Sequence, residues 1–511
     1  MNGRYLLMKN GKKNACTLLL LLSVLLVSCG ETAQTQNSAD TEVKSNNPAA
    51  TEAETEAPAD YTRYDPQLPA IDGGGKDFNL ITRTLSADYC RQIDDISAEA
   101  ANGDVINDAL FDRNSKVMEK YNVNFVIQKA DDVAAKVKKS VMAGDAAWDI
   151  LFEGIAANIQ LASQSMLLSL DSLDAVDTSR PYWCQGMMED LSFGGQHYLG
   201  VSDLTLQAYF ASGIVYFNKT LAANFDLENP YELVDSGKWT LDKLISMCKS
   251  VSADLDGSGV YDEKDQYGIT YNNFAWQIMF YGSGLKMVEK DTNGKLYFNG
   301  TDERIISTLQ RLMPISGDPT VCLYSENFKH VGGNYRIDVC QNAFFEGRAL
   351  FWLEAMYGVT SLRSMELDFG ILPVPKYSEE QKDYSAFIHT VHGSSVAVPL
   401  TVKDPALTGS ILEELSYLSS GGARDAFIEK NLKGKISRDN ESARSIDIIM
   451  NSICTDYTLL LTSYGLTIDS DMRKLMDKAS TDVMSVFEKG VSKYEKILTK
   501  FNDTFGTEAE E

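Results

Sequence analysis

The segment from Asp254 to Asp265 carries acidic side chains at the spacing of a calcium-binding loop. It reads DLDGSGVYDEKD, with oxygen-bearing side chains at loop positions 1, 3, 5, 9 and 12 and a glycine at position 6. Hard oxygen donors at this spacing suit Ca²⁺, and position 7 contributes a backbone carbonyl. The expected ligands are Asp254, Asp256, Ser258, Val260, Asp262 and Asp265. We predict a structural Ca²⁺, held weakly because Asp265 is shorter than the usual glutamate. The alternative is an acidic surface turn.

The thiol of Cys29 is a second group with predictable chemistry. Lysines near the start of the chain precede an apolar run of ten residues, Leu18–Val27, which ends in Ser28, Cys29 and Gly30. The run has the length of a signal-peptide core and falls short of the ~20 residues that a spanning helix needs. Its end resembles the bacterial lipobox, where diacylglycerol is attached to the cysteine, and palmitate is an expected acyl group. We expect residues 1–28 to be a signal peptide and Cys29 to be a lipid anchor on the outer face of the cell membrane. An ordinary secretory signal is the alternative.

The residues after Cys29 predict a tether. No aromatic residue occurs between Glu31 and Asp60, and such a segment buries too little apolar surface to offset its chain entropy. We expect a disordered linker over residues 29–65. A flexible chain of this length reaches roughly 30 Å, so a folded body could move above the membrane.

Composition excludes one class of partner. The formal net charge is −25, with 44% hydrophobic and 10% aromatic residues. This is a globular composition, but nucleic-acid binding needs clustered Lys and Arg, which an acidic chain lacks. Six cysteines follow Cys29 without a CxxC pair, and they are Cys90, Cys184, Cys248, Cys322, Cys340 and Cys454. We expect mostly free thiols in a body this large, although Cys322 and Cys340 are near enough in sequence to bridge.

Two histidines close together, His389 and His392, raise the question of a metal site. No neighbouring cysteine or carboxylate completes a ligand set. A polar role at a hinge or cleft is therefore expected. Catalytic residues are not identified by any motif, and no acid and nucleophile pair is recognisable.

Hydrophobic periodicity predicts alternating strands and helices that must position these groups. The predicted strands are 78–82, 123–127, 148–152, 214–217 and 267–270. Three helices are predicted: one begins at Asp104, a second contains Val133 and ends at a C-cap at Gly144, and a third covers about 240–251. The region from Ile446 to Phe501 is strongly helical, with Ala479, Val483, Phe487, Tyr494 and Leu498 on one stripe. This pattern predicts an α/β protein.

Several short stretches, taken in order, point to a family. They are Trp148–Phe152, Tyr216–Leu221, Trp239–Asp242, Phe344–Leu350 and Asp368–Pro375. Together they resemble the sugar-binding solute-binding proteins of ATP-binding-cassette (ABC) importers, the group of maltose-binding protein. The resemblance extends over residues 70–505 and implies a type II periplasmic-binding-protein-like fold: two α/β lobes joined by crossover hinge strands, which close on a ligand between them. The implied boundaries are residues 66–204 for the first part of lobe 1, 205–392 for lobe 2, and 393–511 for the return to lobe 1 with the C-terminal helices.

The same resemblance suggests where a ligand binds. Arg83 and Glu153 follow strands of the first lobe, where α/β lobes present ligand contacts, and Asp203 lies at the expected first crossover. Lobe 2 regions that line the family's cleft contain Trp276, Trp352, Glu354 and Tyr357, and His392 lies near the return crossover. Aromatic faces would cover sugar rings, and carboxylates would bind hydroxyl groups.

The leading hypothesis is therefore a binding module without catalysis. It is a lipid-anchored monomer that captures a carbohydrate, expected to be an oligosaccharide, and hands it to the permease subunits of an importer. A secreted glycosidase is the second hypothesis, and a sensory or adhesive lipoprotein is the third. Peptides and polyols remain open as solutes, because fold does not fix the ligand.

Overall fold

The computed structural model describes residues 64–69, 71–85, 93–436 and 439–506. The expected signal peptide, Cys29 with its lipid, Cys90 and nearly all of the expected linker lie outside the described residues.

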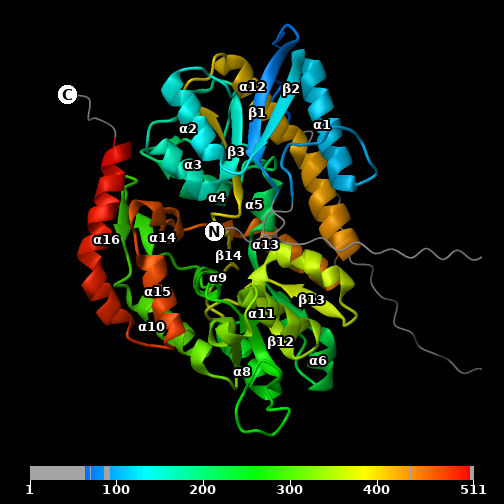
Figure 1. Cartoon of the computed structure of the whole chain (residues 1–511), viewed down its shortest axis with the longest axis vertical. Helices are drawn as coiled ribbons and strands as arrows, with labels where there is room; N and C mark the ends of the chain where they lie inside the picture. Colours follow the sequence, from blue (N-terminus) through cyan, green and yellow to red (C-terminus); the bar gives the residue numbers. More distant parts are fainter. Residues whose placement is uncertain (1–63, 70, 86–92, 437–438, 507–511) are drawn as a thin grey trace, which may run out of the picture. The chain divides into compact units, whose positions relative to one another are not determined.

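The first large sheet combines strands from distant parts of the chain (Figure 1). Its spatial order is β2 (Val123–Ala130), β1 (Lys76–Arg83), β3 (Ile150–Gly154), β15 (Ser394–Pro399) and β4 (Leu167–Leu168). Strand β1 pairs in parallel with β2 and β3, whereas β15 runs antiparallel to β3. All five residues of β3 are buried, as expected for a strand covered on both faces. We refer to this sheet and the helices packed on it as lobe 1.

The second large sheet has the same plan. Its order is β11 (Cys322–Tyr324), β8 (Tyr267–Tyr271), β12 (Ala349–Ala355), β7 (Gly213–Asn218) and β13 (Phe369–Leu372). Strand β8 pairs in parallel with β11 and β12, whereas β7 is antiparallel to β12 and β13. We refer to this sheet and its helices as lobe 2. In each lobe the antiparallel strand, β15 or β7, follows a crossing of the chain between lobes, so the predicted two-lobed α/β fold with crossover strands is confirmed.

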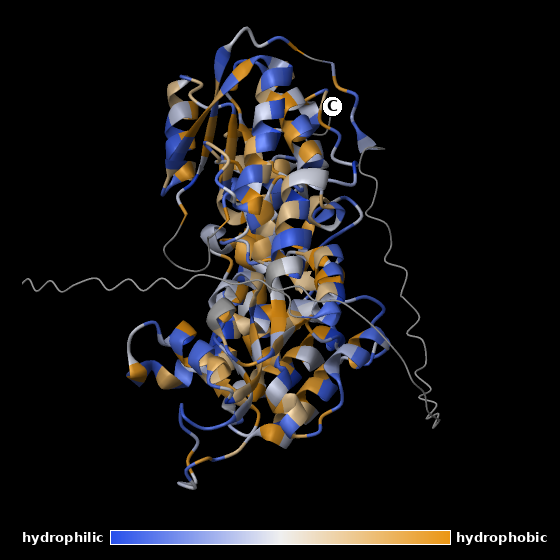
Figure 2. Ribbon diagram, turned by 90° about the vertical axis from the view of Figure 1, so that its right-hand side faces the viewer, coloured by the Kyte–Doolittle hydropathy of each residue, from blue (hydrophilic) through white to orange (hydrophobic). Residues whose placement is uncertain are grey.

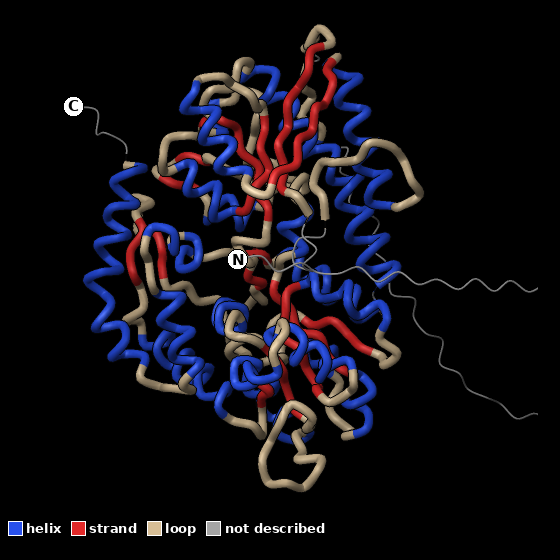
Figure 3. The backbone as a smooth tube through the Cα atoms, in the orientation of Figure 1, coloured by secondary structure: helices blue, strands red, loops and turns tan. Residues whose placement is uncertain are grey.

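Local sequence signals explain where the helices begin and end. Asp104 caps α1 (Val105–Tyr121) by accepting hydrogen bonds from the amides of Ile106 and Asn107. Gly144 ends α2 (Val133–Ala143) with φ of 66°, as expected for a glycine C-cap. The other helices before the return to lobe 1 are α3 (Ile155–Ala162), α4 (Gln185–Asp190), α5 (Leu206–Phe210), α6 (Lys219–Asn224), α7 (Pro230–Asp235), α8 (Leu241–Val251), α9 (Ala275–Gly282), α10 (Glu303–Leu312) and α11 (Tyr335–Phe345). Figure 3 shows helices beside the strands of both sheets.

The C-terminal helices contact both lobes. They are α12 (Pro405–Ser419), α13 (Asn440–Asn451), α14 (Tyr457–Leu460), α15 (Ile468–Asp477) and α16 (Val483–Phe505), with π-helical segments at Ser420–Arg424 and Ala426–Ile436. Helix α12 packs on α1 and α14 on α3, whereas α13 packs on β13 and α15 on α9. The predicted stripe is wrong at Ala479, because that residue has φ of 49° in the turn before α16. The rest of the stripe is buried on α16.

Short strands complete the described fold. They form the pairs β5 (Ser192–Phe193) with β6 (Gln196–His197), β9 (Val288–Lys290) with β10 (Leu296–Phe298), and β14 (Ala386–Phe387) with β16 (Ile453–Cys454). Figure 2 shows hydrophilic and hydrophobic residues alternating around many helices, consistent with one face of each helix packing inward. Among the described helices, none has both the length and the apolar character to cross a bilayer.

Candidate functional site

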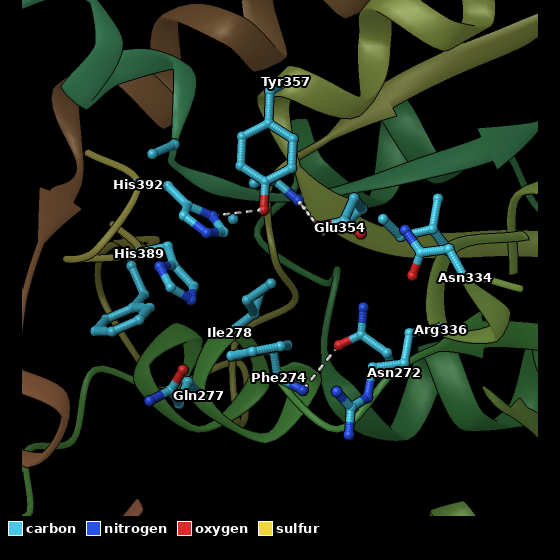
Figure 4. Close-up of a pocket in the computed structure, with 15 residues that line it drawn as sticks. Asn272, Phe274, Gln277, Ile278, Asn334, Arg336, Glu354, Tyr357, His389 and His392 are labelled. Carbon is cyan, nitrogen blue, oxygen red and sulfur yellow. Dashed lines mark hydrogen bonds between the residues drawn. The ribbon is translucent and has the colours of Figure 1, made fainter. Parts of the chain in front are cut away.

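A cavity of about 250 Å³ lies where the edge of the lobe 2 sheet meets residues 387–392, the segment that leads to β15. Strands β8 and β12 are parallel neighbours, so their carboxyl ends lie at the same sheet edge, and the antiparallel β7 begins there. The segments after β8 and β12 therefore supply side chains to one place. The cavity is lined by Ala211, Gly213, Asn272, Phe274, Gln277, Ile278, Asn334, Arg336, Ile337, Glu354, Ala355, Tyr357, Phe387, His389 and His392. Figure 4 shows the labelled side chains around a common space.

Gly213 permits this arrangement at the start of β7. A Cβ atom at this position would lie 2.7 Å from the Cγ2 atom of Ile278. Helix α9 can therefore pack close to the strand and bring Gln277 and Ile278 to the cavity. A larger residue would push the start of α9 away from the sheet edge.

Two stacked imidazoles form one wall of the cavity. The rings of His389 and His392 lie 4.1 Å apart with an interplanar angle of 13°. Among the described residues, neither ring nitrogen of His389 has a hydrogen-bond partner, although both nitrogens are buried. Burial, followed by the charges of His392 and Arg473, holds the pKa of His389 well below its usual value of 6.5. The ring is therefore neutral at physiological pH, with one nitrogen able to donate and the other able to accept.

Tyr357 and Glu354 lie beside this wall. The hydroxyl of Tyr357 is 3.3 Å from Nδ1 of His392, and the two rings meet edge to face. Glu354 is buried, and its Oε1 accepts a hydrogen bond of 2.9 Å from the amide of Ala355. On α11, Arg336 forms an ion pair with Glu326. The cavity thus combines aromatic rings with donors and acceptors, which suits a polar, ring-containing solute.

Three of the eight residues predicted to bind ligand line this cavity: Glu354, Tyr357 and His392. Arg83 and Glu153 do not line it. The guanidinium of Arg83 donates hydrogen bonds of 2.9 Å to the carbonyls of Val391 and His392, and its Nε is 3.6 Å from Oε1 of Glu153. This lobe 1 pair therefore fixes the segment that carries His392 and does not itself line the cavity.

The other three predicted residues lie elsewhere. Asp203 accepts hydrogen bonds from Tyr209 and Ser420, pairs with Arg424 and faces a separate cavity. Trp276 is fully buried, and its indole donates to Asp469. Trp352 is 1% exposed and packs against Tyr216, Phe344 and Phe345. The expectation that these tryptophans present ring faces to a ligand does not match their burial, because both fill the core of lobe 2.

Of the remaining side chains at the cavity, the sequence singles out only His389, as a polar residue of a hinge or cleft. Phe274 and Gln277 lie in the same segment as Trp276, and they line the cavity whereas Trp276 does not. Asn272 directly follows β8, and this position past a strand end is a usable signal. Asn334 and Arg336 come from the start of α11, where the sequence offers no such signal.

Three of the predicted calcium ligands converge. Asp254, Asp256 and Asp265 each offer a carboxylate oxygen, and these three atoms lie within 4.8 Å of one another. Asp254 also accepts hydrogen bonds from the amides of Gly257 and Gly259, and Gly259 has φ of 79° at the sharp turn. The donor set and the turn fit a Ca²⁺ ion.

The other predicted ligands have local partners in the same loop. The hydroxyl of Ser258 donates to the carbonyl of Val260, and Asp262 accepts from the amide of Lys264. Asp265 is 2% exposed and accepts from the amides of Leu255 and Asp262, which closes the loop.

The cysteines of the described chain are free thiols, namely Cys184, Cys248, Cys322, Cys340 and Cys454. Cys322 and Cys340 therefore do not bridge. Burial raises the pKa of the Cys340 thiol to about 12, so this thiol is not a reactive nucleophile at neutral pH.

Known family models do not match the sequence, and neither do curated proteins. Solved structures do match. One is the cyclic α-maltosyl-1,6-maltose binding protein from Arthrobacter globiformis, with a TM-score of 0.57 and 13% identity over 83% of this chain and 99% of that chain.

Two further solved structures give similar values. An ABC substrate-binding protein from Listeria monocytogenes, in complex with cycloalternan, has a TM-score of 0.51 and 11% identity over 84% of this chain and 98% of that one. UgpB from Mycobacterium tuberculosis, in complex with glycerophosphocholine, has a TM-score of 0.53 and 15% identity over 84% and 99%.

At these identities the likeness concerns the fold. The chain has the two-lobed fold of the type II solute-binding proteins. Within that class, its similar structures include binding proteins of the maltose and maltodextrin type.

Proposed function

We propose that this chain is an extracytoplasmic receptor that binds a carbohydrate and delivers it to the permease subunits of an ABC importer. The observation that carries the proposal is the cavity beside β8 and β12, where buried polar atoms of His389 and Gln277 lack partners among the described residues. Buried polar atoms are normally paired. A ligand with several hydroxyl groups would supply both donors and acceptors to them.

The similar solved structures support this ligand class without fixing the compound. One of the three described above is a cyclic α-maltosyl-1,6-maltose binding protein, the second was solved with cycloalternan, and the third was solved with glycerophosphocholine. One fold therefore serves different solutes. An oligosaccharide would place one unit in a cavity of about 250 Å³ and leave the others outside it.

Binding without turnover is part of the proposal. Glycosidases of the common types use two carboxyl groups on either side of the bond that is broken. Among the residues that line this cavity, Glu354 is the one acidic residue. This arrangement favours a receptor over a glycosidase.

A sugar panel tests the proposed function. The purified protein would be melted with glucose, maltose, maltotriose or sorbitol, because a ligand that binds the native state raises the melting temperature. The same mixtures would be analysed for cleaved products. We expect a concentration-dependent rise with at least one sugar and no products. A flat response to every sugar would refute carbohydrate binding, and cleavage would favour the glycosidase.

Lipid attachment at Cys29 completes the proposal, because it would keep the receptor beside its transporter. The support is the sequence from Leu18 to Gly30, with its short apolar run before the cysteine. We expect Cys29→Ser to move the protein from the membrane fraction to the medium of the producing cells. Equal membrane retention of both forms would exclude the anchor.

We also propose that the loop Asp254–Asp265 holds a structural Ca²⁺, supported by the convergence of Asp254, Asp256 and Asp265. Ca²⁺ at about 100 times its Kd should stabilise the native state by ~2.7 kcal/mol. Calorimetric melting in CaCl₂ and in chelator measures this difference. Asp256→Asn tests the role of this carboxylate without disturbing the core, because the Asp256 side chain is exposed. We expect this variant to lose the stabilisation by calcium. Identical melting of the unmodified protein in both buffers would rule out the metal.

A further inference from the structure

Only the nitrogen of the Gln277 side-chain amide has a hydrogen-bond partner among the described residues. Gln277 is 1% exposed, and its Nε2 donates a hydrogen bond of 3.0 Å to Oδ1 of Asp469. Its Oε1 is buried and has no partner among the described residues. Figure 4 shows Gln277 at the edge of the cavity, beneath His389.

Asp469 decides which end of this amide faces the cavity. A carboxylate only accepts hydrogen bonds, so the opposite amide orientation would set Oε1 against Oδ1 of Asp469. The same carboxylate accepts from the indole of Trp276 at 3.1 Å and from Nε of Arg473 at 2.9 Å. Asp469 is thus anchored from α9 and from its own helix, α15. The Gln277 oxygen is consequently fixed as an acceptor directed away from Asp469.

Arg473 holds the neighbouring segment in place. Its guanidinium lies 3.9 Å from the centroid of the Phe274 ring and donates to Oδ1 of Asn273. The Phe274 ring also contacts His389, with 5.2 Å between the ring centroids. Arg473, Phe274, His389 and His392 therefore form a continuous series of contacts from α15 to the cavity wall.

We propose that Asp469 is a positioning residue that sets the hydrogen-bond polarity of the cavity. By fixing Gln277 as an acceptor, it makes the site selective for a neutral solute with a hydroxyl group that donates at this point, and it disfavours a carboxylate there. The inference rests on the proposed function, because it concerns the same cavity. It adds a specificity determinant on α15, a helix that contributes no residue to the cavity lining.

Substitutions on α15 separate this role from a general effect on the helix. Asp469→Ala frees the Gln277 amide to turn its NH₂ group toward the solute. Asp469→Asn is the conservative variant, because its carbonyl oxygen can still accept from Gln277. Asp471→Ala is the matched control: Asp471 lies on the same helix and binds Tyr494 and Lys474 instead. Affinities for the three panel sugars, for sorbitol and for glucuronate would be measured by calorimetric titration.

The expected pattern has three parts. Asp469→Ala weakens binding of the panel sugar with the highest affinity by about tenfold. It also lowers the ratio of the affinity for that sugar to the affinity for glucuronate. Asp469→Asn retains most of both properties, and Asp471→Ala retains both. Equal affinities of Asp469→Ala and Asp471→Ala would overturn the proposal.

A readout without ligand distinguishes this proposal from the proposed function. The side-chain amide signal of Gln277, observed by ¹⁵N-glutamine labelling and assigned with Gln277→Met, should differ between the unmodified protein and Asp469→Ala and be unchanged in Asp471→Ala. If no panel sugar binds, the proposed function fails, and this signal alone decides the positioning role. An Asp469→Ala signal identical to that of the unmodified protein would refute it.

Discussion

His389→Phe should weaken sugar binding by about 10- to 100-fold while leaving the free energy of unfolding unchanged or raising it. Both ring nitrogens of His389 are buried without partners among the described residues, and each such group costs about 1–3 kcal/mol. Phenylalanine retains a ring between Phe274 and His392 and removes both nitrogens. The unbound protein therefore loses no hydrogen bond, whereas a bound hydroxyl group loses its partner.

Calorimetric titration and urea unfolding would measure the two effects of His389→Phe separately. His330→Phe is the matched control, because the His330 side chain is 68% exposed, and we expect no change in sugar affinity there. The interpretation of the cavity would be contradicted if His389→Phe bound sugar as tightly as the unmodified protein. It would also be contradicted if affinity and stability fell together.

Trp276→Ala should lower the free energy of unfolding by ~3–5 kcal/mol, the usual cost of removing a large buried aromatic side chain. Trp276 is fully buried, contacts Phe280 and Tyr281, and donates to Asp469. Its loss opens a cavity and removes one donor from that carboxylate. Urea unfolding monitored by circular dichroism would measure the change.

Trp148→Ala is the control for Trp276→Ala. Trp148 is only partly buried, so its removal should cost less than half as much. A tryptophan that stacked on a ligand would behave differently, because its removal would cost affinity and leave stability near the original value. That outcome at Trp276 would restore the sequence-based assignment of this residue to the binding site.

The elements that sequence predicted well are those with local causes. Asp104 and Gly144 mark the ends of α1 and α2 because a cap depends on residues within one helical turn. The apolar run at Ile150–Phe152 marks a buried strand for a similar reason. Ala479 was misplaced because apolar spacing continues through a turn that only the backbone angle of that residue reveals.

The site was predicted in part, for a physical reason. The segment with Glu354 and Tyr357 resembles cleft-lining regions of the solute-binding proteins, and both residues line the cavity together with His392. Aromatic character alone could not separate a ligand face from a core side chain, so Trp276 and Trp352 were assigned to the site although they are buried. The role of Asp469 depends on a contact between residues 192 positions apart in sequence, which no local pattern indicates.

The most direct test of the central claim is a calorimetric titration of the unmodified protein with glucose, maltose, maltotriose and sorbitol. We expect saturable binding of at least one of the three sugars, with one site per chain and with the sugar recovered uncleaved. Absence of binding of all three sugars to the folded protein, or release of cleaved products, would contradict the proposed function.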